Sequence, residues 1–128
     1  MNKTLKVVLT IIVCFVLIAG GALFSLSRGL NEVSELVISN IDLKLHEDGL
    51  YRGLYNAGRF TNEIEVEIRN NEITRLSILQ DVRFSRQEVI DELFDSVIKN
   101  QSLDFDIVSG ATVTGKAYLK AIENALTQ

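Results

Sequence analysis

The hydrophobic pattern divides the chain into an apolar N-terminal run and a longer part in which apolar and polar residues are interleaved. From Val7 to Leu26 the sequence VVLTIIVCFVLIAGGALFSL contains no charged residue. At a rise of about 1.5 Å per residue, this run forms a helix of roughly 30 Å, which matches the hydrocarbon layer of a bilayer. The sequence therefore predicts a single transmembrane helix, with residues 1–26 forming the N-terminal tail and the membrane anchor.

The charges beside this run predict its orientation in a cell membrane. Lys3 and Lys6 precede it, and the first 26 residues contain no acid. The positive-inside rule then places the N-terminus in the cytoplasm and residues 27–128 outside it. Cleavage as a signal peptide is the alternative, since Gly20–Ala22 are small residues. We favour an uncleaved anchor, because Leu23–Leu26 continue the apolar stretch where a mature N-terminus is normally polar.

Helical spacing of apolar residues recurs in three segments after the anchor. Residues 30–41 predict a short helix inside a linker at 27–42. Residues 85–100 carry one apolar stripe and an acidic outer face, which predicts an amphipathic helix. A second amphipathic helix is expected to begin near Thr114 and to run towards the C-terminus.

The segments between the linker and these helices have the pattern of strands. Residues 49–55 form the first, and residues 61–69 alternate between apolar and charged positions, as in a half-buried strand. Residues 72–79 follow after Asn70-Asn71, and asparagine tolerates the positive φ angles of a two-residue hairpin turn. We expect residues 43–128 to form an α+β domain, a small antiparallel sheet with helices packed on one face.

Composition and charge exclude several classes of function. The chain has 128 residues, one His, one Cys and a net charge of -4. One Cys cannot form an internal disulfide, and one Cys with one His cannot complete a usual zinc site, so no metal site is expected. Residues 27–128 carry 11 basic against 17 acidic side chains, a net charge of -6. This charge disfavours nucleic acid as a partner and predicts repulsion from anionic lipid headgroups.

The segment before the last helix allows two interpretations. Residues 110–116 (GATVTGK) fit the G-x-x-x-x-G-K core of a nucleotide-binding loop. However, Ala117 stands where such a loop needs a Ser or Thr for magnesium. The remaining residues also leave no room for a following Asp-bearing strand. We therefore disfavour a nucleotide hydrolase.

The same residues resemble a different motif more completely. Asp106-Ile-Val-Ser109-Gly110-Ala111-Thr112 resembles the Asp-x-x-Ser/Thr-Gly-Ala-Thr acceptor motif of the FMN-binding domain family. Upstream, residues 48–53 (DGLYRG) resemble the Asp-Gly-x-Tyr-x-Gly segment with which that family opens. A strand, a turn and a second strand lie between the two motifs, in the order that the family has.

The resemblance implies a function as well as a fold. In the family, FMN is attached through its phosphate to the last Thr of the motif, here Thr112, by a separate flavin transferase. It implies that Asp106 and Ser109 belong to the sequence that this transferase recognises. Membrane redox proteins or a quinone-linked reductase are the partners that it implies.

The chemistry of the motif agrees with this implication. Gly110 and Ala111 allow close approach of the backbone, and the N-terminus of the following helix favours a negative phosphate. Thr114 is the expected N-cap, and Lys116 either supplies a cation to the phosphate or is a solvated surface residue. Tyr51 is a weaker candidate for stacking on the flavin, since core packing is the simpler role for it.

These observations lead to two hypotheses from different classes. The first is a membrane-anchored, extracytoplasmic flavoprotein that carries covalent FMN on Thr112 and transfers electrons. The alternative is an anchored binding or scaffold module of the same fold that holds FMN weakly or not at all. The sequence identifies no catalytic residue, so we expect a carrier or a subunit of a redox complex, not a stand-alone enzyme.

Overall fold

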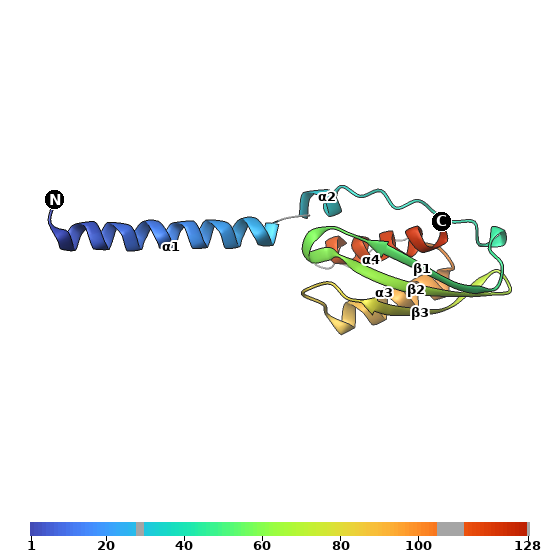
Figure 1. The fold of residues 1–128 in the computed structure, drawn as a ribbon. Helices are drawn as coiled ribbons and strands as arrows, with labels where there is room; N and C mark the ends of the chain where they lie inside the picture. The colour runs from blue at the N-terminus through green and yellow to red at the C-terminus, as the bar shows by residue number, and fades with distance from the viewer. Residues whose placement is uncertain (28–29, 105–111, 128) are drawn as a thin grey trace.

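The computed structural model describes residues 1–27, 30–104 and 112–127. Strands in a run are followed by helices, so the fold is α+β, as predicted (Figure 1). The elements are α1 (Lys3–Ser27), α2 (Leu30–Ser34), the 3₁₀ turn η1 (Leu43–Leu45), β1 (Gly49–Tyr55), the 3₁₀ turn η2 (Gly58–Phe60), β2 (Asn62–Arg69), β3 (Glu72–Gln80), α3 (Gln87–Asn100) and α4 (Thr112–Leu126).

The N-terminal helix α1 is long and apolar enough to cross a membrane, by its length and composition. None of its residues is buried against the rest of the protein. A core helix of the same hydrophobicity would be covered by its neighbours, so the exposed apolar surface of α1 supports the predicted anchor. The orientation of α1 in the membrane, and the expectation that the anchor is not cleaved, stay predictions from the flanking sequence.

The sheet is an antiparallel meander in the order β1-β2-β3. The predicted alternation in β2 is confirmed, because Ile64, Val66 and Ile68 are fully buried while the glutamates between them are partly exposed. One face of the sheet therefore packs on the core, and the other carries charged side chains in contact with solvent.

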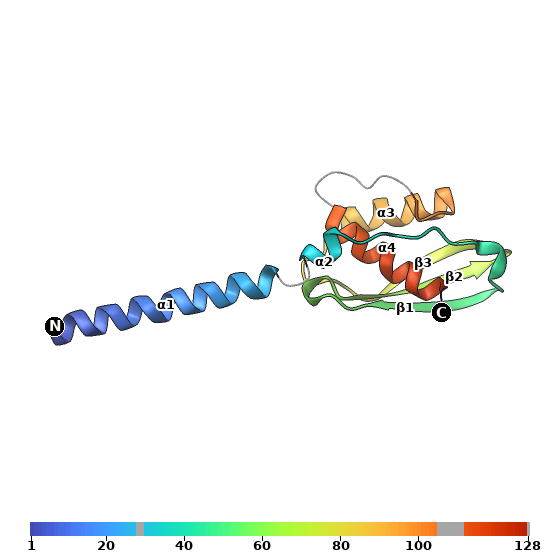
Figure 2. The same cartoon turned by 90° about the horizontal axis from the view of Figure 1, so that it is seen from above.

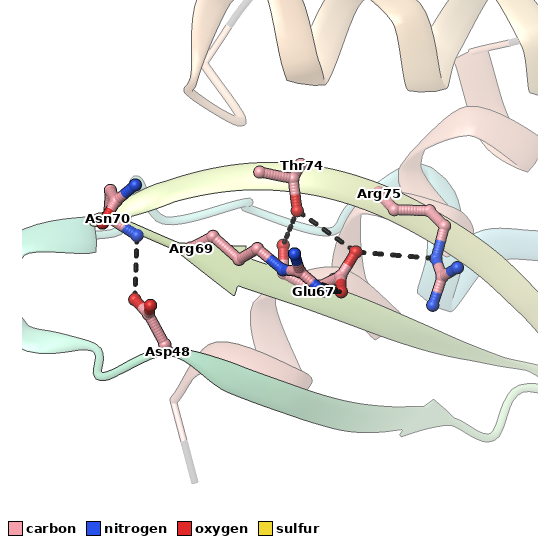
Figure 3. A network of polar contacts seen from close by, with 6 residues as sticks. All are labelled: Asp48, Glu67, Arg69, Asn70, Thr74 and Arg75. Atoms are coloured by element: carbon pink, nitrogen blue, oxygen red, sulfur yellow. Dashed lines mark hydrogen bonds and ion pairs between the residues drawn. The ribbon is translucent and has the colours of Figure 1, made fainter.

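The turn between β2 and β3 has the backbone that the sequence predicts. Asn70 has a φ of 53° and Asn71 a φ of 61°, which are the positive values of a tight hairpin turn. Asp48 Oδ1 accepts a hydrogen bond of 2.8 Å from the Asn70 N–H, which ties the start of β1 to the turn (Figure 3). The Glu67 carboxylate beside the turn pairs with two exposed arginines, Arg69 and Arg75.

Helix α4 lies against the buried face of the sheet, and a glycine allows it to come close. A Cβ atom on Gly53 of β1 would overlap the carbonyl oxygen of Ala121 and would lie 2.9 Å from the Cα atom of Ala125. The backbone of α4 thus touches the backbone of β1. This close contact explains the second glycine of the segment 48–53 and fixes the position of α4 on the sheet.

Helix α3 packs beside α4 and against β3, on the same side of the sheet (Figure 2). Its C-cap is Gln101, the residue after Asn100, which has a φ of 51° in the left-handed region. The Gln101 side-chain amide donates to the Ile73 carbonyl at 2.9 Å and accepts from the Ile73 N–H at 2.7 Å. One side chain therefore provides hydrogen-bond partners for the N–H and the carbonyl of Ile73, at the free edge of β3.

The predicted linker helix over 30–41 is shorter in the structure, where α2 ends at Ser34. Val33 is fully buried, and α2 packs on α4. Beyond α2 the chain is extended, and Leu36, Ile38 and Ile41 are partly buried against the core. The extended path lets more apolar side chains reach the core than a helix with one contacting face, so packing overrides the local helical pattern.

Candidate functional site

The site begins at Thr112, the first residue of α4. Its side chain is exposed. The helix starts two residues earlier than predicted, so Thr114 lies within the first turn and is not the N-cap. The N–H groups of that turn have no acceptor within the helix and carry partial positive charge, which makes this end of α4 favourable for an anion.

A groove of about 180 Å³ lies beside the first turn of α4. Its walls come from α2, η2, the loop after β3, and α4, four parts of the chain that are distant in sequence. Most of the lining side chains are apolar, and two are aromatic. They are Leu30, Arg59, Phe60, Val82, Phe84, Val113 and Thr114.

Arg59 is the charged residue of the groove. It lies in η2, where Gly58 has a φ of 54° and lets the chain turn sharply. Its guanidinium carbon lies 4.9 Å from the centre of the Phe60 ring. Arg59 Nε is buried and has no hydrogen-bond partner in the described parts of the chain. A buried N–H of a cation without an acceptor is unfavourable, so this position is suited to an anionic oxygen.

A tyrosine of α4 holds the groove wall that follows β3. The Tyr118 hydroxyl donates a hydrogen bond of 2.5 Å to Asp81 Oδ1, and the same oxygen accepts one of 2.7 Å from the Val82 N–H. Tyr118 is fully buried. Burial, together with the Asp81 carboxylate, raises the pKa of the Tyr118 hydroxyl well above its ordinary value. The hydroxyl therefore stays protonated and fixes the loop that supplies Val82 and Phe84.

Lys116 makes a structural contact in the described structure. Its Nζ donates a hydrogen bond of 3.0 Å to the Ser34 carbonyl at the end of α2. This bond fastens α2 to the first turns of α4. The nucleotide-loop interpretation needs Lys116 on a phosphate, and the following Ala117 is fully buried in the core.

Tyr51 lies near the other end of α4. Its ring makes an edge contact with His46 at 5.5 Å, and His46 Nε2 contacts the carbonyl of Leu126, the last residue of α4. The 15 residues of α4 span about 21 Å between their first and last Cα atoms. Two other aromatic residues, Phe60 and Phe84, line the groove beside the first turn of α4. Neither was predicted from the sequence as a site residue.

Four of the predicted site residues, Asp106, Ser109, Gly110 and Ala111, lie outside the described residues. Of the others, Thr112 and Thr114 are at the groove end of α4, while Lys116 binds α2. Arg59 was not among the predicted site residues, because no local sequence pattern distinguishes an arginine that lines a groove from a solvated one. Only the fold brings η2 beside the start of α4.

A small α+β domain with a partly apolar groove at a helix N-terminus has the features of a module that binds an anionic, ring-containing ligand. The family model of the FMN-binding domain matches residues 58–127, over half of the chain. The chain therefore belongs to the FMN-binding domain family, as the acceptor motif indicated. No curated protein matches it.

The groove residues fit FMN chemically. The phosphate needs donors and positive charge, which the first turn of α4 and the unpaired Arg59 Nε can supply. The flavin ring needs apolar contacts, and Phe60 and Val113 can supply them. The groove, at about 180 Å³, is smaller than the roughly 300 Å³ at the low end of enclosing ligand pockets, so it could enclose only part of a flavin ring.

Proposed function

We propose that this protein carries FMN as a phosphoester on Thr112 and transfers electrons at the outer face of a membrane. The observation that carries the proposal is the exposed Thr112 at the N-terminus of α4, next to a groove in which Arg59 Nε is buried and has no hydrogen-bond partner among the described residues. Membership of the FMN-binding domain family supports the flavin, and the apolar helix α1 supports the membrane.

Three groove residues have a role in this proposal. Arg59 and the first-turn N–H groups of α4 would hold the phosphate, and Phe60 and Val113 would contact the ring. The Tyr118–Asp81 bond keeps the opposite wall in place. FMN itself supplies the one- and two-electron chemistry, while the domain binds and orients it. The open groove leaves the ring accessible to another redox centre.

Covalent attachment is consistent with a site outside the cytoplasm, where a dissociated cofactor is lost. A separate flavin transferase makes the bond by moving the FMN unit of FAD to the Thr112 hydroxyl. The oxygen–phosphorus ester forms, the bond between the two phosphates breaks, and AMP leaves. In this proposal the transferase supplies the catalytic groups for this step.

The proposal is tested by the intact mass of the full chain, purified from cells that contain an active flavin transferase. The expected product is heavier by the mass of FMN minus water. Thr112→Ala removes the acceptor oxygen, so its product should be unmodified. Thr114→Ala is the matched control, because it removes a hydroxyl from the same helical turn and should keep the adduct.

An unmodified wild-type chain in cells that modify another acceptor protein would overturn the covalent proposal. The anchored binding module would then be the better interpretation of the fold. Flavin fluorescence of the denatured protein gives an independent measurement, since only a covalently bound flavin stays with the chain.

A further inference from the structure

The groove end of the domain is tied closely to the anchor. Ser27 ends α1 and Leu30 begins α2, so three peptide steps separate them. A chain of that length spans at most about 11 Å. Leu30 also lines the groove. One wall of the groove therefore lies within about 11 Å of the end of α1.

Helix α2 cannot act as a loose spacer, because it is attached to the domain in three ways. Val33 is buried in the core. Glu32 Oε1 accepts a hydrogen bond of 3.4 Å from the Tyr55 hydroxyl, and the Ser34 carbonyl accepts one from Lys116. Moving the domain away from the anchor would require breaking all three contacts.

A polar hollow of about 450 Å³ lies on this same end of the protein. It is lined by Ser25, Gly58, Arg59, Thr61, Gln80, Asp81 and Arg83, and Ser25 belongs to the last turn of α1. Two of these residues are arginines. Asp81 is the one acid in this lining, and its Oδ1 accepts the hydrogen bond from the Tyr118 hydroxyl, so the two guanidinium groups give the lining a net positive charge.

Phe84 adds an exposed apolar group next to the arginines. Its side chain is 59% exposed, although it belongs to the loop that Asp81 fixes. Aromatic and cationic residues together are typical of surfaces that contact the headgroup region of a bilayer. The net charge of -6 does not prevent such contact. Charges elsewhere on the domain are screened beyond about 8 Å at physiological salt, while these arginines lie beside α1.

We propose that Arg83 and Phe84 form a surface that rests on phospholipid headgroups and holds the groove at the membrane. We call these two residues the headgroup surface. The Arg83 guanidinium contacts lipid phosphates, and the Phe84 ring enters the interfacial layer. This inference rests on the proposed membrane anchoring by α1, but it does not require bound FMN.

The test measures how close chosen residues are to the lipid surface. The full chain carries Cys14→Ser, which removes its one cysteine, and Thr112→Ala, which prevents flavin attachment. A fluorophore is attached to Phe84→Cys, Leu50→Cys or Ser27→Cys. The protein is placed in vesicles of phosphatidylcholine and phosphatidylglycerol, with part of the lipid bearing a nitroxide on its headgroup.

Leu50 is the matched control for Phe84, because its side chain is 58% exposed and it lies at the opposite end of the domain. We expect strong quenching at positions 84 and 27 and several-fold weaker quenching at position 50. Equal quenching at 84 and 50, with position 27 strongly quenched, would overturn the headgroup surface and leave the anchor intact. Weak quenching at position 27 would overturn the anchor and the headgroup surface together.

Charge reversal tests the role of Arg83. Arg83→Glu should reduce the quenching at position 84 several-fold, because it places an acid against lipid phosphate. Arg69→Glu makes the same change of charge at the far end of the domain, where the arginine side chain is 68% exposed, and should leave the quenching unchanged. Equal quenching in both variants would show that Arg83 does not contact the headgroups, contrary to the proposal.

Discussion

The Tyr118 hydroxyl donates a hydrogen bond of 2.5 Å to Asp81 Oδ1 and thereby joins the buried side of α4 to the loop after β3. These two residues are 37 positions apart in the sequence. Their bond holds one wall of the groove against the helix that begins at Thr112. This polar contact therefore links the groove to the packing of the core.

Tyr118→Phe should lower the free energy of unfolding by about 1–2 kcal/mol at neutral pH, because the hydrogen bond to a carboxylate is lost while the ring stays packed. The raised pKa of Tyr118 makes this difference depend on pH. The stabilisation is complete below pH 10, the ordinary pKa of tyrosine. Above it the unfolded chain releases the proton more readily, so the wild type loses stability.

Urea unfolding of both proteins from pH 7 to 11 measures this effect. The stability difference between wild type and Tyr118→Phe should shrink above pH 10. A difference that stays constant over this range would show that the folded protein does not hold the Tyr118 proton.

Gly53→Ala should be strongly destabilising. The added Cβ meets the backbone of Ala121 and Ala125, which cannot rotate away like a flexible side chain. We expect a loss of about 3 kcal/mol or more, at the upper end of over-packing effects. Gly49→Ala in the same strand is the control, since its nearest neighbour would be a Tyr51 ring atom at 4.0 Å. Thermal denaturation of the two variants should separate them clearly, and equal melting temperatures would contradict the close contact of α4 with β1.

The hairpin turn offers a test of backbone strain. Asn71 has a φ of 61°, so Asn71→Val should cost about 1–2 kcal/mol, since a β-branched residue is poorly tolerated there. Asn71→Gly relieves the steric restriction and should be neutral or slightly stabilising. Chemical denaturation of both variants measures the sign. If Val and Gly gave the same stability, the positive φ would not be a constraint on this turn.

The packing of α2 on the core predicts that two valines four positions apart contribute very differently to stability. Val33 is 0% exposed and Val37 is 80% exposed. Val33→Ala removes two buried methyl groups and should cost about 2 kcal/mol, while Val37→Ala should change the stability by less than about 0.5 kcal/mol. Urea unfolding in detergent measures both. Similar small effects would mean that α2 is not part of the core.

Arg59→Met should destabilise the form with FMN attached more than the form without it. Without FMN it removes a buried N–H that lacks an acceptor, so the stability should stay within about 1 kcal/mol of the wild type. With FMN attached it removes a cation from the phosphate, so the variant should be less stable than flavinylated wild type by about 1–3 kcal/mol. Thermal unfolding of matched samples tests this, and an equal effect on both forms would place Arg59 outside the phosphate site.

Several elements were predictable because their causes are local. The alternation of Ile64, Val66 and Ile68 with glutamates is sufficient to define β2, since neighbouring residues in a strand face opposite sides. Asn70-Asn71 defines the turn for a similar reason. The length of the apolar run defines α1, because a bilayer sets the length of the helix that crosses it.

Other features depended on contacts between distant residues, and sequence reasoning placed them incorrectly or missed them. The helical spacing over 30–41 holds only as far as Ser34, because Leu36 and Ile38 gain more from packing in an extended chain. Gln101 caps the edge of β3 through contacts 28 residues away. No periodicity in the sequence signals either outcome.

By itself, the sequence determined the long apolar helix, most of the strands and helices, the motif that ends at Thr112, and the family to which the chain belongs. Each of these follows from residue types at short spacing. Only the tertiary structure decided that Arg59 lies beside the start of α4 and that α2 is part of the domain. Residues 27–128 have a net charge of -6, yet the fold gathers Arg59 and Arg83 beside the end of α1. The position of a charge is a property of the folded chain, and a sum over the sequence does not contain it.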